Sequence, residues 1–316
     1  MTPAKPFFPT VFAAGLASAQ AATLDPGGRR RSDPRREGGT LNRAQPFAAR
    51  YGPWALVTGA SDGIGQAFAR SLAAQGLNLV IVARRQNLLE SLATELEATW
   101  GIECRVVAAD LSQQQEVLRV HTAVADVDLG LLVMAAGFGT SGELATADLA
   151  DELSMLQVNC AATLMLTRLE LPRLVRKGRG GIVLMSSLLG FMGVPRAAHY
   201  AATKAYVQSL AEGLRVELRP LGIDVVASAP GPVHSGFAAR ADMHLPAGVK
   251  PEAVAAGTLQ ALGSRGTVRP GFLSKLMAWS MGTLPRWARV HIMARVMGGI
   301  TAHQATGAGR RIGTSP

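Results

Sequence analysis

The stretch GIVLMSSLLGFMGVPRAAHYAATKAYV, residues 181–207, decides how the rest of the chain is interpreted. It begins with the apolar run Ile182 to Met185, which is typical of a buried strand. A loop then leads into an Ala-rich segment typical of a helix. That segment carries Tyr200 and Lys204, whose spacing of four residues places both side chains on one helix face. The stretch therefore predicts a strand, a loop and a helix.

The same stretch brings together three side chains suited to acid–base chemistry. A Tyr hydroxyl, with a pKa of about 10, exchanges its proton slowly at neutral pH unless a nearby cation favours the phenolate. Lys204 lies one helical turn from Tyr200, and Ser187 follows the predicted strand, where its hydroxyl could hold a carbonyl oxygen. The three residues predict a site that delivers a proton to a carbonyl. A Tyr and a Lys at this spacing also occur in ordinary amphipathic helices, so the rest of the chain has to decide.

A glycine-rich sequence, TGASDGIG at residues 58–65, lies between an apolar run that begins at Trp54 and a segment typical of a helix. Glycines at 59, 63 and 65 permit a tight turn, close approach of the backbone to a phosphate, and close packing of the helix start on the strand. Free N–H groups at the helix start would face a pyrophosphate. The strand–turn–helix context indicates a dinucleotide-binding loop.

The second predicted strand, Asn78 to Ala83, ends in Arg84 and Arg85. In a dinucleotide fold the residue closing this strand faces the adenosine ribose, where an acid favours NAD and an Arg pairs with the 2′-phosphate of NADP. We expect Arg84 to make this contact, with Arg85 as the alternative. The simpler explanation is a solvated Arg at a helix start. The predicted cofactor is NADP(H) in preference to NAD(H).

Short apolar runs alternate with helical segments over most of the chain. We expect strands at 54–58, 78–83, 103–108, 129–135, 182–186, 224–228 and 267–269, and helices at 64–75, 86–100, 149–175, from Tyr200 to about 218, and at 251–262. This alternation predicts an α/β fold with a Rossmann-like, doubly wound parallel sheet, in a single domain with a helical C-terminal extension. The two cysteines are too few for a disulfide framework and favour a reducing, cytoplasmic location.

The net charge of +10 is carried at the two ends of the chain. Residues 1–50 carry +5, residues 265–316 carry +8, and residues 51–264 carry −3. A nucleic-acid binder is expected to carry its positive charge on a folded face, so we expect no nucleic-acid partner. Basic ends suit solubility or contact with an anionic membrane surface. The six His residues stand in no metal-ligating pattern, so no metal is expected.

Residues 1–45 are expected to form an extension, because Pro residues, Gly pairs and a run of Arg interrupt any amphipathic pattern. Lys5, the apolar residues 7–16 and the small residues 17–22 are similar to a secretory signal, although Pro9 interrupts the apolar core. We therefore expect a disordered or misassigned leader rather than a signal or transit peptide. The catalytic domain is expected at 46–270, and a flexible tail at 301–316.

The segment 271–300 is both apolar and basic, with Trp279, Trp287 and several Met among Lys and Arg residues. Its apolar runs are far shorter than the roughly 20 residues that a bilayer span needs. Three interpretations are open: a helical cap over the active site, an interfacial membrane helix, or an oligomer contact. Met-rich stripes most often belong to ordinary packing, which favours the cap.

With TGASDGIG at 58–65, Asn159, Ser187 and YAATK at 200–204 in this order and spacing, residues 51–269 resemble the classical short-chain dehydrogenase/reductase family. The resemblance implies an NAD(P)(H)-dependent oxidoreductase that acts on a small carbonyl or alcohol substrate as a homodimer or homotetramer. It implies that Tyr200 is the general acid–base, that Lys204 lowers its pKa and holds the nicotinamide ribose, that Ser187 orients the carbonyl, and that Asn159 supports a proton-relay water. The cofactor would be held by Gly59, Ser61, Asp62, Gly63, Ile64, Gly65, Arg84, Arg85, Asp110, Leu111, Ala136, Gly137, Tyr200, Lys204, Pro230, Gly231, Val233 and Ser235.

One departure and one finer similarity qualify the resemblance. Met134-Ala135-Ala136-Gly137 stands where the family commonly has Asn-Asn-Ala-Gly, so the usual Asn contacts to the central sheet and the cofactor are missing. The opening YGPWALVTGASDGIGQAFARSLAAQGLNLVIVARR, residues 51–85, is similar to the branch of long-chain 3-oxoacyl reductases and beta-hydroxysteroid dehydrogenases. We expect an NADPH-dependent reductase of a hydrophobic, lipid-like ketone. The alternatives are a non-catalytic NADP-binding sensor or scaffold, and a peripheral membrane protein that acts through its basic tail at 272–300.

Overall fold

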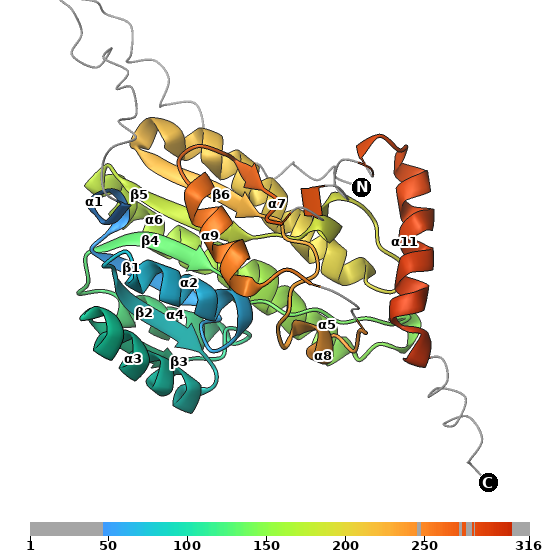
Figure 1. Ribbon diagram of the computed structural model, residues 1–316, viewed down its shortest axis with the longest axis horizontal. Coiled ribbons are helices and arrows are strands. Elements are labelled where there is room, and N and C mark those ends of the chain that lie inside the picture. The colour runs from blue at the N-terminus through green and yellow to red at the C-terminus, as the bar shows by residue number, and fades with distance from the viewer. Residues whose placement is uncertain (1–46, 245–247, 272–273, 276–279, 281, 305–316) are drawn as a thin grey trace, which may run out of the picture. The chain divides into compact units, whose positions relative to one another are not determined.

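The computed structural model describes residues 47–244, 248–271, 274–275, 280 and 282–304. The expected leader at 1–45 lies outside the described residues, as does the expected tail at 301–316 except for residues 301–304. All described residues belong to one compact unit that spans Gln45–Pro316. The site is therefore built within a single domain, shown in Figure 1.

A seven-stranded parallel sheet forms the centre of the domain (Figure 1). Its strands are β1 (Trp54–Thr58), β2 (Asn78–Ala83), β3 (Cys104–Ala108), β4 (Leu129–Met134), β5 (Gly180–Met185), β6 (Ile223–Ser228) and β7 (Thr267–Val268). The spatial order is β3-β2-β1-β4-β5-β6-β7. The chain reverses its direction of winding between β1 and β4, which is where doubly wound sheets bind ligands. The expected Rossmann-like fold is confirmed.

Helices cover both faces of the sheet. The described helices are α1 (Phe47–Tyr51), α2 (Gly63–Ala73), α3 (Gln86–Trp100), α4 (Gln114–Ala123), α5 (Leu149–Leu156), α6 (Thr163–Lys177), α7 (Ala198–Leu218), α8 (Phe237–Arg240), α9 (Pro251–Ala261) and α11 (Arg286–Ile300). Apolar residues of α2, α3 and α9 share one core cluster with the sheet, and those of α4, α6 and α7 share another. The parallel strands need crossover connections, which the helices supply on both faces.

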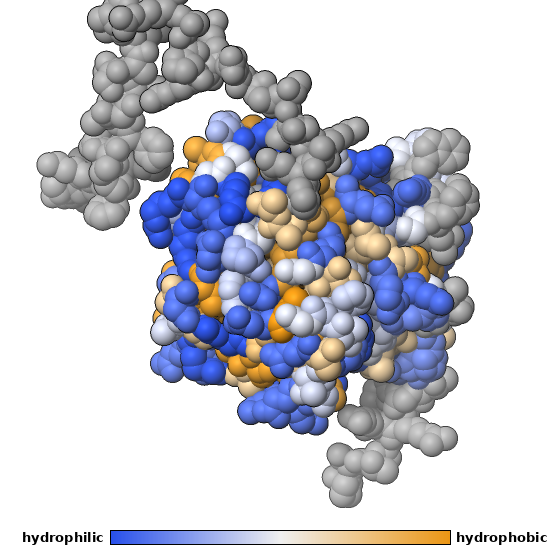
Figure 2. Space-filling model, turned by 60° about the vertical axis from the view of Figure 1, so that its left-hand side comes forward, coloured by the Kyte–Doolittle hydropathy of each residue, from blue (hydrophilic) through white to orange (hydrophobic). Residues whose placement is uncertain are grey.

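Alternate residues along each strand supply the two core clusters. In β1, Ala55 and Val57 belong to the cluster with α2, whereas Leu56 belongs to the cluster with α6 and α7. These three side chains are fully buried. Burial on both faces explains why the strands read as continuous apolar runs rather than as alternating patterns. On the face shown in Figure 2, hydrophobic residues form small areas among hydrophilic ones.

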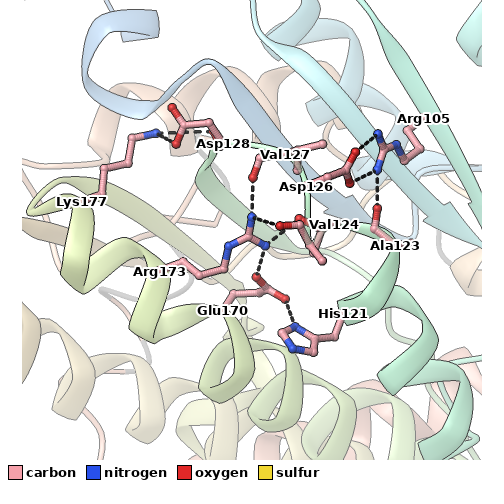
Figure 3. Close-up of polar contacts among 11 residues, drawn as sticks. Arg105, His121, Ala123, Val124, Asp126, Val127, Asp128, Glu170, Arg173 and Lys177 are labelled. Carbon is pink, nitrogen blue, oxygen red and sulfur yellow. Dashed lines mark hydrogen bonds and ion pairs between the residues drawn. The ribbon is translucent and has the colours of Figure 1, made fainter.

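Helix α4 was not among the expected helices. Its sequence is mostly polar, and only Val117 and Val120 are buried. A polar network fastens its C-terminal end to α6 (Figure 3). There Glu170, fully buried, bonds His121 Nδ1 at 2.5 Å and accepts from Arg173 Nη1 at 3.0 Å. Arg173 also donates to the carbonyl of Val124 at 2.6 Å, which satisfies a helix-end carbonyl that α4 leaves free. Tertiary contacts therefore hold a helix that its own pattern specifies weakly.

The expected helix at 149–175 is present but is not uniform. It runs from α5 through the π-helical turn η2 (Gln157–Ala162) into α6, which continues past Pro172 to Lys177. Such a single π turn within an α-helix frequently marks a functional site. Here it carries Asn159.

Helix α11 supplies most of the described part of the apolar C-terminal segment, and Figure 1 shows it at one edge of the domain. Residues 272–273, 276–279 and 281 of that segment lie outside the described residues. Among the helices that the structure describes, none is both long and apolar enough to cross a membrane.

Candidate active site

Helix α7 places Tyr200 and Lys204 on the face that is turned toward the protein interior. The helix is 21 residues long. Its Val207 and Ala211 belong to the core cluster shared with the sheet, whereas Tyr200 and Ala201 belong to a separate cluster that includes Met293 and Met297. Only 7% of Tyr200 and 6% of Lys204 is exposed. The four-residue spacing therefore places both side chains on one face of the helix, where they line the same cavity.

The end of strand β5 supplies the facing wall. Ser187 begins the short 3₁₀ helix η3 (Leu188–Phe191), and its Oγ accepts a hydrogen bond from the backbone of Leu189 at 3.2 Å. Ser186 Oγ donates to the carbonyl oxygen of Lys204 at 3.0 Å, which ties β5 to α7. Ser187 therefore stays beside Tyr200 in the cavity.

Lys204 is held by its burial and by one backbone contact. Its Nζ donates to the carbonyl oxygen of Met185 at 2.9 Å. Loss of solvent lowers the pKa of Lys204 to about 8, because burial disfavours the ammonium form. Near neutral pH the side chain thus keeps its charge at an energetic cost.

Burial also raises the pKa of Tyr200 to about 12, and a hydrogen bond with Ser187 acts in the opposite direction. The Lys204 Nζ lies 5.8 Å from the centroid of the Tyr200 ring. The family resemblance assigns to Lys204 a lowering of the Tyr200 pKa, whereas burial and the Ser187 bond are the causes that act on that pKa here. That role stays a prediction.

Asn159 secures the loop after β4. Its Oδ1 accepts from the backbone of Phe138 at 3.1 Å, and its Nδ2 donates to the carbonyl of Phe138 at 2.9 Å and to Thr203 Oγ1 at 3.0 Å. An added Cβ on Gly137 would lie 2.9 Å from Asn159 Oδ1 and 3.2 Å from Lys204 Nζ. The loop therefore approaches the site as closely as only glycine allows.

The glycine-rich loop forms one end of an open groove. Gly59 and Gly63 have positive φ angles of 72° and 53°, and a Cβ on Gly65 would meet the carbonyl oxygen of Gly59 at 2.2 Å. The residues present therefore fit the backbone cradle that a dinucleotide needs. The cavity in this groove has a volume of about 430 Å³. Its lining includes the predicted cofactor residues Gly59, Ser61, Asp62, Gly63, Ile64, Gly65, Arg84, Arg85, Asp110, Leu111, Ala136, Gly137 and Ser235.

Two polar contacts cross this groove. The backbone N–H of Gly236 donates to Asp62 Oδ2 at 3.3 Å, and Arg85 Nη2 donates to Ser61 Oγ at 3.1 Å. At the end of β4, beside Met134 and Ala135, Thr58 Oγ1 accepts from the N–H of Ala136 at 3.0 Å. A residue of the glycine-rich motif thus joins the end of β1 to the loop after β4.

The other predicted residues line a second cavity, of about 190 Å³, which adjoins the groove. Pro230, Gly231 and Val233 lie here, with Ser187, Tyr200 and Lys204, whereas Ile64, Gly137 and Ser235 line both cavities. Asn159 is in neither lining and acts through the loop that it holds. The predicted residues therefore gather along one continuous path.

The remaining wall of the second cavity is apolar and was not predicted residue by residue. It consists of Ala135, Met185, Leu188, Leu189, Pro232, Phe237, Met243, Met293, Val296, Met297 and Ile300. The last four belong to α11. The ring of Phe237 lies 5.3 Å from that of Tyr200, centroid to centroid. The only sequence signal for this wall was the Met-rich composition of the C-terminal segment.

Known proteins resemble this chain in sequence and in fold. The model of the short chain dehydrogenase family matches residues 53–245. A very-long-chain 3-oxoacyl-CoA reductase of Podospora anserina is 40% identical over 181 residues, which are 55% of this chain and 53% of that protein. The chain thus matches about half the length of that relative, which comes from the branch indicated by residues 51–85.

Solved structures extend the likeness to most of the domain. A structure from a study of 7beta-hydroxysteroid dehydrogenase stereoselectivity has a TM-score of 0.73 and 26% identity, and the match covers 79% of this chain and 99% of that one. A short-chain dehydrogenase of Sphingobium yanoikuyae in complex with NADPH has a TM-score of 0.66 and 29% identity, covering 74% and 97%.

Proposed function

Because this chain belongs to the short chain dehydrogenase family, we propose that it is an NADP(H)-dependent oxidoreductase that interconverts a hydrophobic ketone and its secondary alcohol. The observation that carries the proposal is the placement of Tyr200, Lys204 and Ser187 in one apolar cavity that opens onto the glycine-rich groove. A proton donor, a hydroxyl for the carbonyl oxygen and a dinucleotide cradle thus meet at one point.

In this proposal the protein positions the carbonyl and supplies the proton. Ser187 donates a hydrogen bond to the carbonyl oxygen, and Tyr200 transfers its phenolic proton to the same oxygen as negative charge develops there. The Lys204 ammonium stabilises the phenolate left behind. NADPH, when bound, supplies the hydride to the carbonyl carbon, so that hydride and proton together give the alcohol. The reverse sequence oxidises the alcohol.

The groove suggests how the cofactor is held. Its glycine-rich end would take the pyrophosphate at the start of α2, where backbone N–H groups and the helix dipole favour an anion. Arg84 and Arg85 line the other part of the groove, with Arg85 already bonded to Ser61. A ribose 2′-phosphate there would gain charge-assisted hydrogen bonds, which is the basis for preferring NADP(H).

The cavity suggests what kind of substrate is bound. Apart from Ser186, Ser187, Tyr200, Lys204 and Ser235 its walls are apolar, and four Met residues give them an adaptable shape. The two similar proteins named for an activity act on a very-long-chain 3-oxoacyl-CoA and a hydroxysteroid. We infer a lipid-like ketone of one of these kinds, covered by α11 as a cap.

The proposal also covers the oligomeric state and the cellular location of the protein. We expect a homodimer or homotetramer in the cytoplasm. The segment 272–300 adds a candidate contact with anionic membranes, because α11 carries three Arg residues and its Trp287 is 69% exposed.

A titration with NADPH and NADH, followed by protein fluorescence, tests the cofactor assignment. We expect tight NADPH binding that Arg84→Ala or Arg85→Ala weakens roughly tenfold or more, since a hydrogen bond to a charged group contributes about 1.5–3 kcal/mol. NADH binding should be unchanged, and Arg119→Ala, a surface charge outside the groove, should change neither. Equal affinities for NADPH and NADH that neither Arg substitution changes would contradict the NADP(H) preference. Failure to bind either nucleotide would contradict the proposed function.

A further inference from the structure

The start of α7 has an unusual attachment. Ala197, at the N-cap position, has φ −147° and ψ 35°, and among the described residues no side chain caps the free N–H groups there. Arg196, one residue earlier, has a positive φ of 64°. Since Tyr200 is the third residue of α7, the position of its ring depends on how this first turn is held.

A buried carboxylate on another helix provides the attachment. Glu152, on α5, is 6% exposed, and a hydrogen bond of 2.6 Å joins its Oε2 to His199 Nδ1 in the first turn of α7. Its Oε1 accepts from Thr140 Oγ1, also at 2.6 Å. Both carboxylate oxygens are therefore used, and the single residue Glu152 joins α5, the loop after β4 and the start of α7.

The segments that Glu152 joins are the ones that enclose the Tyr200 ring. A Cβ added to Gly139, next to Thr140, would lie 3.1 Å from Tyr200 Cδ2 and 2.7 Å from Phe237 Cζ. The loop backbone therefore lies directly against the phenol ring. His199 immediately precedes Tyr200 on the helix. A shift of either partner of Glu152 would move the Tyr200 hydroxyl.

Burying a carboxylate costs free energy, and well-packed apolar residues often stabilise a fold equally well. A polar clamp with two directional hydrogen bonds instead fixes geometry. We propose that Glu152, through His199 and Thr140, is a positioning residue that holds the Tyr200 hydroxyl in line with the carbonyl oxygen. This inference rests on the proposed role of Tyr200 as the proton donor.

Glu152→Gln tests the clamp, with Glu170→Gln as a matched control. Glu170 is also a buried carboxylate bonded to the Nδ1 atom of a His, but it belongs to the α4–α6 network of Figure 3, outside both cavity linings. Reduction of the best ketone from a panel of aryl ketones, steroid ketones and 3-oxoacyl thioesters is measured per NADPH-binding site, in H₂O and in D₂O.

We expect Glu152→Gln to lower kcat roughly tenfold or more and to raise the solvent isotope effect on kcat, because a misplaced hydroxyl slows proton transfer. NADPH affinity should stay within twofold. Glu170→Gln should lower the Tm yet leave kcat and its isotope effect within twofold. A merely structural role predicts loss of Tm for both variants, with unchanged kcat and isotope effect per binding site, and that result would overturn the inference.

Variants of His199 keep the test decisive even where Glu152→Gln does not fold. His199→Asn retains an amide N–H near the position of Nδ1 and should keep kcat within about threefold. His199→Leu removes that bond and should reproduce the loss of kcat and the raised isotope effect. Equal kcat for the two would overturn the inference while the proposed function stands. If the unaltered protein reduced no ketone, that result would contradict both the proposed function and this inference.

Discussion

Lys204 is a charged side chain that is almost fully buried, and burying its charge lowers the free energy of unfolding of the protein. Burial lowers its pKa from 10.5 to about 8. The unfolded protein therefore binds more protons between these pH values, and stability rises with pH across this window. Below about pH 8 the ammonium is charged in both states, so the full cost of burying it is present.

Lys204→Met should remove this cost and so stabilise the unliganded protein while abolishing activity. From the pKa difference we expect a gain of about 3 kcal/mol in the free energy of unfolding at pH 7. Urea denaturation at pH 7 and near pH 10 measures it, and the gain should shrink at the higher pH. The exposed control Lys250→Met should change stability by less than about 0.5 kcal/mol. A variant less stable than the parent at pH 7 would contradict the assigned cost.

At this scale the sequence could predict the residues that share an element. Tyr200 and Lys204 are linked by helical spacing, and the glycines by a motif whose turn requires them. It could not predict that Glu152 bonds both Thr140 and His199, because these bonds join three different segments of the folded chain. It also could not show that burial outweighs the hydrogen bond with Ser187 in setting the Tyr200 pKa.

Among the elements, α11 supplies four residues to the wall of the proposed substrate cavity. Its inner side chains Met293 and Met297 are 5% and 2% exposed and line the cavity with Tyr200. These contacts favour the proposal that the segment caps the cavity, which stays a proposal. The segment's composition indicated packing, but the turn of the helix toward the site depends on its tertiary contacts.

Met297→Trp should fill part of the cavity without touching the groove. We expect KM for a bulky ketone to rise roughly tenfold or more, as overpacking a cavity costs about 1–3 kcal/mol, while KM for a short aldehyde changes little. Steady-state kinetics with both substrates measures the difference. Arg295→Trp adds the same ring on the exposed side of α11 and serves as the control. A uniform change for both substrates would argue against a cap that selects by size.

The elements themselves were largely predictable. The strands are continuous apolar runs because both faces of the sheet are covered, and these runs gave their bounds to within one or two residues. Helix α4 was not predicted, because it has only two buried valines and is held by the Glu170–Arg173 network. The π turn at Asn159 also has no signature in the local pattern of apolar residues.

For the whole molecule, alternation of strands and helices sufficed to predict the sheet, since parallel strands need crossover helices on both faces. The winding reverses between β1 and β4, and the groove opens there, as doubly wound sheets require. The shape of the apolar cavity could not be predicted, because it is closed by α11 from the far end of the chain.

The central claim is that this molecule reduces a ketone with Tyr200 as the proton donor. The direct measurement is NADPH-dependent ketone reduction by the unaltered protein, by Tyr200→Phe and by Tyr206→Phe, which alters a half-exposed Tyr on the same helix. We predict that Tyr200→Phe lowers kcat by at least about 100-fold, within the contribution expected of general acid catalysis, and still binds NADPH. Tyr206→Phe should stay within twofold of the unaltered protein. Full turnover by Tyr200→Phe would contradict the account.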